Sequence, residues 1–421
     1  MSASDRTDLF GSLSDIRIID LTQMLAGPFG TMMLADHGAE VIKVEPLEGD
    51  MTRRGGPFRP DDSLQLLGGY FQSVDRNKRS VCLDLKSDAG RAALLALLRD
   101  ADAVVENFRA GVMDRLGLGW EVLHEVNPKL VYGCLRGFGD PRTGASPYVE
   151  WPAFDPVAQA MGGIMAITGP DAKTPTKIGP GIGDIVPGMM LAFGVLSAIH
   201  HARRTGEGQF VDVAMVDAVL AVCERTVYQR SVLGQIPAPE GNHHPFLVPF
   251  GLFPAKDGWV ALAAQQDSVF VQLCEALGAP GLASDGRFAN HAARNENRDV
   301  VLAALGELTS VWTKAELSKK LGGRVPFGPV LDIAEIEVDP HFAVREMLPE
   351  VEQPGCSAPI RVAGTPIRMT ATPGGVRRRA PFLGEDTRAQ LRQAGLSEAE
   401  IQSLIDMREA RAFTPPEGVA Q

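Results

Sequence analysis

Asp184 is the side chain whose surroundings most clearly permit chemistry. It follows Gly181, Ile182 and Gly183 and directly precedes a long apolar stretch that is typical of a helix. Aspartate is among the best helix N-caps, because its carboxylate accepts hydrogen bonds from the first backbone N–H groups and is favoured by the helix dipole. The local pattern therefore predicts a capping residue whose carboxylate stays ionised near neutral pH. The flanking glycines let another group approach the backbone closely.

Motifs for the common cofactors of an α/β protein are absent from the chain. No GxGxxG follows the first predicted strand, and no GxxxxGK[ST] loop occurs, so a dinucleotide or ATP site is unsupported. The five cysteines are odd in number, and no two of them have CxxC spacing. This pattern favours a reduced protein without a disulfide framework or a zinc site.

Charge and hydropathy restrict the classes of binding partner and the cellular compartment that we expect. The formal net charge of −11 disfavours nucleic acid or an anionic membrane as the main partner, although a local basic pocket can still bind a small anion. The N-terminus lacks the pattern of a signal peptide. The most apolar run, Ile185–Ile199, contains proline and glycine and is too short to span a bilayer. A cytoplasmic protein is predicted.

Short apolar runs alternate with helical patterns in the first half of the chain. The predicted strands are Ile16–Leu21, Val41–Glu45, Ser80–Leu85, Ala103–Phe108, Leu130–Phe138 and Gln209–Ala214. The predicted helices are Phe29–Asp36, Asp88–Asp100, Ile185–Arg204 and Met215–Cys223. This alternation predicts an α/β fold with a parallel, doubly wound sheet. Ligands of such sheets bind at the carboxyl ends of the strands, here after Leu21, Glu45, Phe108 and Leu135.

The length of 421 residues predicts more than one domain. The boundaries are placed at 1–225 for a large domain, 226–335 for a smaller one and 336–421 for the remainder. The smaller domain begins with a predicted hairpin, His244–Phe253 and Trp259–Ala264, and continues with helices over 268–322. An amphipathic helix is predicted over Ser397–Arg411, with a capping box formed by Ser397 and Glu400.

Seven segments together carry a resemblance to a known family. They are IRIIDLTQMLAGPFGTMMLADHGAEVIKVE (16–45), GDMTR (49–53), NKRSVCLDLK (77–86), VENF (105–108), GIGDIVPG (181–188), TGEGQFVDVAMVDAV (205–219) and FLGEDT (382–387). In this order they resemble the class III CoA-transferases, also called the CaiB–BaiF family. The resemblance implies a Rossmann-like large domain formed by both ends of the chain, an inserted smaller α+β domain, and an interlocked, ring-like homodimer.

The resemblance also implies a reaction. Asp184 matches the family's nucleophilic aspartate, which moves CoA between carboxylic acids through anhydride and thioester intermediates. One thioester replaces another, so neither ATP nor a metal is required. The partners implied are an acyl-CoA and small carboxylic acids, and the CoA thioester is a substrate rather than a permanently bound cofactor. Succinyl-CoA is the expected donor.

Several positions match CoA-contacting residues of the family: Gln23, Leu83, Lys86, Asn107, Phe108, Arg115 and Arg136. The alternative for Lys86 and Arg115 is a solvated helix face, and for Leu83 and Phe108 it is plain core packing. Pro46 replaces an arginine that some members use for CoA. Arg53 or Arg54 is therefore a candidate for holding the adenosine end.

The acceptor pocket is expected to include Gly137 and Phe138. Backbone N–H groups near Gln23 or in the loop 137–139 are candidate oxyanion donors. His243 and His244 stand where some members carry a glycine loop, and they bind a substrate carboxylate or simply lie on a surface loop. This departure disfavours formyl-CoA:oxalate exchange. It leaves glutarate, malate, citramalate and mesaconate open as acceptors.

Two other classes of function compete with CoA transfer. The α-methylacyl-CoA racemases share the fold but carry a histidine immediately before the aspartate that matches Asp155. That position is Phe154 here, and a phenylalanine cannot carry a proton. The second competitor, a CoA-binding protein without catalysis, is disfavoured by the intact Asp184 and its glycine neighbours.

Overall fold

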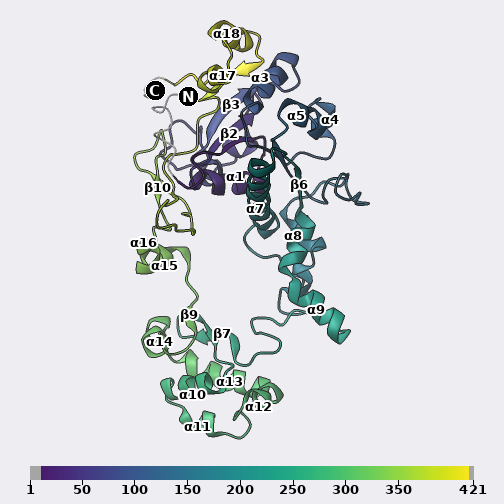
Figure 1. The fold of residues 1–421 in the computed structure, drawn as a ribbon. Coiled ribbons are helices and arrows are strands. Elements are labelled where there is room, and N and C mark those ends of the chain that lie inside the picture. Colours follow the sequence, from purple (N-terminus) through teal and green to yellow (C-terminus); the bar gives the residue numbers. More distant parts are fainter. Residues whose placement is uncertain (1–10, 417–421) are drawn as a thin grey trace. The chain divides into compact units, whose positions relative to one another are not determined.

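The chain divides into two compact units. The computed structural model describes residues 11–416, and Figure 1 follows them from end to end. The first unit contains residues 11–164, 178–227 and 341–416, and the second contains residues 165–177 and 228–340. Each unit has a sheet and a hydrophobic core of its own. The two units are therefore described separately.

A seven-stranded sheet forms the centre of the first unit, in the order β12-β3-β2-β1-β4-β5-β6. Strands β1 to β6 pair in parallel, and among the described strands of this sheet β12 alone is antiparallel. The strands are β1 (Arg17–Asp20), β2 (Glu40–Glu45), β3 (Arg79–Leu83), β4 (Ala103–Glu106), β5 (Val131–Arg136), β6 (Phe210–Ala214) and β12 (Ala410–Arg411). Strands β2, β4 and β5 are buried throughout, as central parallel strands are. The predicted parallel α/β sheet is confirmed.

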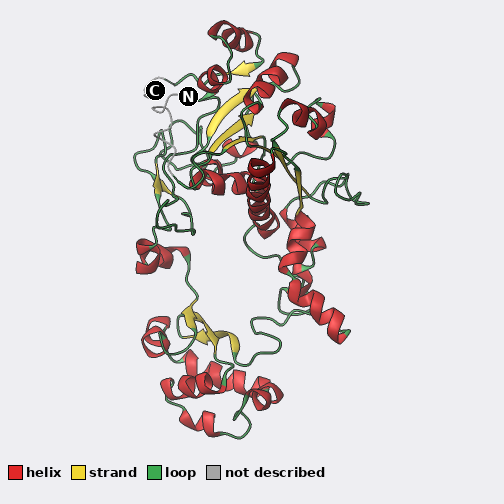
Figure 2. Ribbon diagram, in the orientation of Figure 1, coloured by secondary structure: helices red, strands yellow, loops and turns green. Residues whose placement is uncertain are grey.

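Helices pack around this sheet, as Figure 2 shows. They are α1 (Ala26–Asp36), α2 (Gly69–Asp75), α3 (Asp88–Leu98), α4 (Val112–Arg115), α5 (Trp120–Val126), α6 (Asp155–Met161), α7 (Ile182–Thr205), α8 (Met215–Val222), α17 (Thr387–Gln393) and α18 (Glu398–Asp406). Short elements are η2 (Met51–Arg53), β10 (Glu350–Val351) and β11 (Ile360–Arg361). Three further elements cross the boundaries between the units: η3 (Ile164–Ile167), α9 (Glu224–Leu233) and α16 (Pro340–Val344). Helix α7 is longer than the apolar run suggested, and its length and composition alone would allow it to cross a membrane. It packs against α1, β5 and α8 with residues such as Leu191 and Val195 buried.

The second unit is a small α+β body. Its antiparallel sheet has the order β7-β8-β9, with strands β7 (Phe250–Ala255), β8 (Gly258–Ala263) and β9 (Phe327–Pro329). The helices are α10 (Asp267–Ala276), α11 (Pro280–Ser284), α12 (His291–Glu296), α13 (Arg298–Ser310), α14 (Lys314–Leu321) and α15 (Ile333–Val338). The predicted hairpin is present, but its first strand begins at Phe250 rather than at His244.

The C-terminal helix is shorter than the sequence predicted. Its capping box is confirmed, because the Ser397 hydroxyl accepts a hydrogen bond from the Glu400 N–H. The helix ends at Asp406, and Arg408 adopts a left-handed conformation with φ of 58°. This turn lets β12 pair with β3, where Ala410 lies opposite Leu83. Edge pairing with the sheet therefore overrides the helical pattern.

Helices α1 and α7 approach each other closely enough for their backbones to touch. A Cβ atom at Gly30 would lie 2.4 Å from the Gly188 carbonyl oxygen, and a Cβ at Gly188 would lie 2.3 Å from the Ala26 carbonyl oxygen. Only glycine fits at such distances. The contact fixes the N-terminal part of α7, which carries Asp184, beside α1 and the loop that precedes it.

We predict that Gly188→Ala destabilises the protein by on the order of 2–3 kcal/mol, because the new methyl group overlaps a backbone carbonyl that cannot yield without separating the helices. Urea unfolding measures the effect. Gly144→Ala is the matched control, since a Cβ at Gly144 would meet no atom within 4 Å. Equal unfolding midpoints for the two variants would contradict the proposed close packing.

Candidate active site

The strand order places a topological switch point between β1 and β4. The chain continues from β1 through β2 and β3 toward one edge of the sheet, and from β4 through β5 and β6 toward the other. Ligands of doubly wound sheets bind at the carboxyl ends of the strands at such a point. A cavity of about 360 Å³ lies there. The predicted site residues that line it are Gln23, Asn107, Phe108, Arg136, Gly137 and Asp184.

Asn107 joins the two loops at the switch point. Its side-chain oxygen accepts a hydrogen bond from the Gln23 N–H at 2.8 Å, and its side-chain nitrogen donates to the Gln23 carbonyl at 2.8 Å. Next to this contact, Met24 has a left-handed φ of 68°, which is uncommon for a residue other than glycine. The Gln23 N–H is thus already engaged by Asn107. The expectation that this particular group donates to an oxyanion is not supported.

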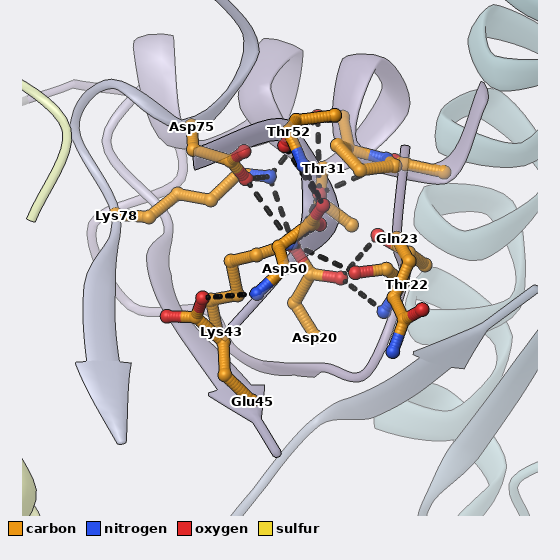
Figure 3. Close-up of polar contacts among 12 residues, drawn as sticks. Asp20, Thr22, Gln23, Thr31, Lys43, Glu45, Asp50, Thr52, Asp75 and Lys78 are labelled. Carbon is orange, nitrogen blue, oxygen red and sulfur yellow. Dashed lines mark hydrogen bonds and ion pairs between the residues drawn. The ribbon is translucent and has the colours of Figure 1, made fainter. Parts of the chain in front are cut away.

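A network of buried charges lies directly beneath the loop after β1 (Figure 3). Its members are fully or almost fully buried: Asp20, Lys43, Asp50, Asp75 and Lys78. The Lys78 ammonium lies 2.9 Å from Asp20 and 2.8 Å from Asp75. The Lys43 ammonium lies 3.0 Å from Asp50 and 3.4 Å from Asp75. Buried charges are tolerated when they are paired and hydrogen-bonded in this way.

The network holds the backbone that leads into Gln23. Lys43 donates to the Thr22 carbonyl at 2.8 Å, and Asp20 accepts hydrogen bonds from both the N–H and the hydroxyl of Thr22. Burial raises the pKa of Asp20, but the ammonium groups of Lys78 and Lys43 and the hydroxyls of Thr22 and Thr31 outweigh it and lower that pKa to about 2. Asp20 therefore remains a charged acceptor at neutral pH.

Asp184 lies in the first turn of α7 and is not its cap. The helix begins at Ile182, with Gly181 at the N-cap position and no side-chain cap from that residue. Within residues 11–416, the Asp184 carboxylate has neither a cation nor a hydrogen-bond donor as a partner. Burial, and then the nearby Asp155, raise the pKa of Asp184 to about 7. The prediction that Asp184 caps this helix was therefore wrong, and its carboxylate is only partly ionised at neutral pH.

Asp155 takes the capping role instead. This buried residue opens α6, and its carboxylate accepts hydrogen bonds from the Gly183 N–H at 2.9 Å and from the Gln159 side chain at 2.8 Å. A Cβ at Gly183 would lie 2.7 Å from the Asp155 carbonyl oxygen. Glycine at position 183 lets the two helix starts meet. The Asp155 carboxylate therefore interacts favourably with the N-terminal end of the α7 dipole. The Asp184 carboxylate is not needed for that role and lines the cavity.

Arg136 lines the cavity but is already neutralised. Its guanidinium pairs with Glu106 at 2.6 Å and with Asp140, and it donates to the Phe108 carbonyl at 3.2 Å. Burial lowers the pKa of Arg136, but Glu106, Cys134 and Asp140 together outweigh burial and raise that pKa. In this arrangement Arg136 orders the Phe108 backbone. It adds no unpaired positive charge to the cavity.

The other predicted CoA contacts lie outside the lining of this cavity. Lys86 and Arg115 are exposed, and Leu83 is buried in β3 as part of the core. Arg53 is also buried, where it forms a two-pronged pair with Glu45, both contacts being 2.7 Å, and donates to the Pro381 carbonyl. Arg53 is consequently occupied and cannot take the place of the arginine that Pro46 replaces.

The predicted acceptor residues are divided between the two units. Gly137 lines the cavity, while Phe138 is buried next to Trp151, with ring centroids 6.2 Å apart. His243 and His244 belong to the second unit and line a separate cavity of about 500 Å³. There the His244 ring nitrogen accepts hydrogen bonds from the N–H groups of Phe246 and Leu247, each at 3.1 Å.

Sequence reasoning assigned no role at this site to three residues: Tyr70, Arg109 and Asp155. Tyr70 and Arg109 line the cavity. Burial, and then Asp184, raise the pKa of Tyr70 to about 12, so its hydroxyl keeps its proton near the Asp184 carboxylate. For Arg109 the sequence did hold a signal, because this residue directly follows VENF (105–108), the family segment at the end of β4. Asp155 was considered only as the neighbour of Phe154 in the comparison with the racemases, and Tyr70 carried no local signal.

Comparisons with known proteins agree with this α/β fold. The profile described as CoA-transferase family III matches residues 13–387. Succinyl-CoA:mesaconate CoA-transferase of Haloarcula hispanica is 48% identical over 389 residues, which cover 92% of this chain and 97% of that protein. Acetyl-CoA:oxalate CoA-transferase of Acetobacter aceti is 40% identical, covering 86% and 90%. A crystal structure of a CaiB/BaiF family protein from Brucella suis aligns with a TM-score of 0.81 at 34% identity, covering 91% and 100%.

The chain belongs to CoA-transferase family III, the CaiB/BaiF family. It is an enzyme that transfers CoA between an acyl-CoA and a carboxylic acid. The predicted family and the predicted class of reaction are confirmed.

We predict that Asp155→Asn lowers the pKa of Asp184 below its value of about 7. The substitution removes a nearby negative charge but keeps an oxygen that can accept from the Gly183 N–H. If the reaction needs ionised Asp184, the rising limb of kcat/KM against pH shifts to lower pH. The exposed Asp100 provides the control Asp100→Asn. An unchanged midpoint in Asp155→Asn would show that Asp155 does not act on Asp184.

We also predict that Asn107→Leu lowers kcat by roughly 10- to 100-fold, since two hydrogen bonds to the Gln23 backbone are lost at similar side-chain size. Asn107→Asp should give a smaller loss, because it retains an acceptor for the Gln23 N–H. Steady-state kinetics of CoA transfer measure both. A rise in KM for the acyl-CoA with kcat unchanged would instead assign Asn107 to CoA binding alone.

Proposed function

We propose that Asp184 is the covalent nucleophile of this CoA-transferase. The observation that carries the proposal is its carboxylate at the switch-point cavity, unpaired among the described residues and with a pKa of about 7. A carboxylate without a cation partner retains its nucleophilicity once it is ionised. A pKa near 7 leaves a large ionised fraction at neutral pH.

The reaction proceeds in four displacements. The Asp184 carboxylate attacks the thioester carbonyl of the donor, and the carbon–sulfur bond breaks to give a mixed anhydride and CoA thiolate. The thiolate attacks the aspartyl carbonyl, which forms aspartyl-CoA and frees the donor acid as its carboxylate. The acceptor carboxylate then attacks aspartyl-CoA and releases the thiolate again. Finally the thiolate attacks the acceptor acyl carbonyl, which forms the new acyl-CoA and restores Asp184.

Each displacement exchanges one acyl oxygen or sulfur bond for another, so the proposed sequence uses no permanently bound cofactor. Gln23 and Phe108 line the cavity and serve as candidate contacts for the CoA thioester. Lys86 and Arg115 are proposed to meet the CoA phosphates from the protein surface, since they are exposed cations.

We propose succinyl-CoA as donor and a small dicarboxylic acid as acceptor. The support comes from relatives named succinyl-CoA:mesaconate CoA-transferase, at 48% identity, and succinyl-CoA–D-citramalate CoA-transferase of Chloroflexus aurantiacus, at 38% identity. Glutarate, malate, citramalate and mesaconate form the first acceptor panel.

We propose that the enzyme is a cytoplasmic homodimer with an inserted small domain at about 226–335. Large apolar side chains that are exposed in the single chain support a partner subunit. Phe193 of α7 is 75% exposed, and Val232 of α9 is also 75% exposed. Exposed apolar side chains that gather on one element mark interaction surfaces, and Met189 and Met190 of α7 are exposed together with Phe193. The five free cysteines suit a reducing compartment.

Asp184→Ala is expected to lower CoA transfer by on the order of a thousand-fold or more, since a covalent route is lost. Trapping gives a direct test: hydroxylamine added together with succinyl-CoA should modify Asp184 of the wild-type enzyme. Peptide mass spectrometry locates the adduct, and a sample without the thioester is the control. An Asp184→Ala enzyme as fast as wild type, or an adduct on another carboxylate, would refute the nucleophile assignment.

A further inference from the structure

One segment supplies a continuous apolar part of the lining of the switch-point cavity. It lies between β5 and α6, and we call its lining residues the apolar wall: Val149, Trp151, Pro152, Ala153 and Phe154. Among these side chains, only the Trp151 indole carries a hydrogen-bonding group. The wall can therefore offer a substrate little except contact with carbon.

The apolar wall is held against the end of β5. A Cβ atom at Gly137 would lie 2.4 Å from the Ala153 Cβ, so glycine at position 137 lets the wall approach the strand end closely. The Trp151 ring packs on Tyr148 and Phe138, with ring centroids 4.6 Å and 6.2 Å apart. These contacts give the wall a fixed place, which reduces the ordering cost of binding a ligand there.

The end of the wall is joined to the turn that carries Asp184. Phe154 directly precedes Asp155, whose carboxylate accepts the Gly183 N–H at 2.9 Å. Gly183 in turn directly precedes Asp184, and both Phe154 and Asp184 line the cavity. Even so, Phe154 is 61% exposed and Trp151 is 55% exposed. Large aromatic surfaces are thus left uncovered in the cavity of the proposed nucleophile.

The acids of the first acceptor panel differ in how they would use such a surface. Carboxylate and hydroxyl groups lose hydrogen bonds to water without compensation when they meet an apolar wall. A methyl branch, in contrast, gains free energy when it leaves water and packs on an aromatic ring. Citramalate and mesaconate carry a methyl branch, whereas malate and glutarate do not. The wall therefore favours the branched members of the panel.

We propose that Trp151 and Phe154 bind the methyl-bearing carbon of the acceptor and thereby select branched dicarboxylic acids over their unbranched counterparts. The substrate class is a four-carbon dicarboxylic acid with a methyl group on C2. This inference rests on the proposed function, because it places the acceptor in the cavity of Asp184.

The experiment uses two pairs of acceptors that differ by a single methyl group. They are mesaconate with fumarate, and citramalate with malate of the same configuration. Succinyl-CoA is the donor throughout, and kcat/KM is measured for each acceptor with the wild-type enzyme, Trp151→Ala, Phe154→Ala and Phe154→Leu. Met407→Ala is the control, since Met407 is 71% exposed at the end of α18 and is not part of the cavity lining.

The wild-type enzyme is expected to favour the methylated acid of each pair by roughly five-fold or more, the ratio that corresponds to burial of one methyl group. Trp151→Ala and Phe154→Ala should bring this ratio toward one, because the ring that covers the methyl group is lost. Phe154→Leu should keep most of the ratio, since leucine retains a large apolar side chain. Met407→Ala should leave the ratio unchanged.

A wild-type enzyme that distinguishes the acids of neither pair would overturn the proposal. Alanine variants that keep the wild-type ratio would do the same, including variants that lose activity equally with both acids, because an equal loss places the wall against the CoA thioester that every reaction shares. A failure of the proposed nucleophile appears elsewhere, as the absence of a trapped adduct on Asp184. The ratio compares two acceptors on one enzyme and does not depend on that adduct.

Discussion

The hydrogen bond from the buried Lys43 ammonium to the Thr22 carbonyl is the contact on which the site depends most. A lysine charge with no exposed surface is tolerated only because Asp50 and Asp75 surround it, and Lys78 with Asp20 completes the set. Lys43 and Asp20 both form hydrogen bonds to Thr22, and these contacts fix the loop after β1. The same loop begins α1, whose contact with α7 positions Asp184. The buried ion pairs therefore help to position Asp184 through the loop after β1 and through helix α1.

At the start of α7, helix capping and the proposed nucleophilic role fall to two different carboxylates. A capping carboxylate is stabilised by N–H donors, which lowers its pKa and its reactivity. Asp155 accepts the Gly183 N–H and carries that role. Asp184 gains no such donors, and burial beside Asp155 raises its pKa to about 7. The pair keeps the helix end satisfied and leaves one carboxylate poised between its charged and neutral forms.

The number of arginines near the cavity does not give the number of cations that are available to bind an anion. Arg53 lies in a segment that resembles the family and Arg136 matches a basic position of the family, yet both are buried against carboxylates. Their guanidinium groups pair with these carboxylates and hold backbone carbonyls in place, those of Pro381 and Phe108. Arg109, by contrast, lines the cavity with an exposed side chain that is unpaired among the described residues.

The sequence by itself determined the class of fold, the family and the position of the candidate nucleophile. Apolar strands alternating with helices imply a parallel sheet because buried strands must be apolar along their length, and Asp184 stands in a motif of adjacent residues. Tertiary structure alone decided which carboxylate caps α7, which arginine is free and how the loops are joined. Those outcomes depend on contacts between distant positions, such as Asp155 with Gly183 and Asn107 with Gln23. Burial and pairing set the charge of each group, and both exist only after the chain has folded.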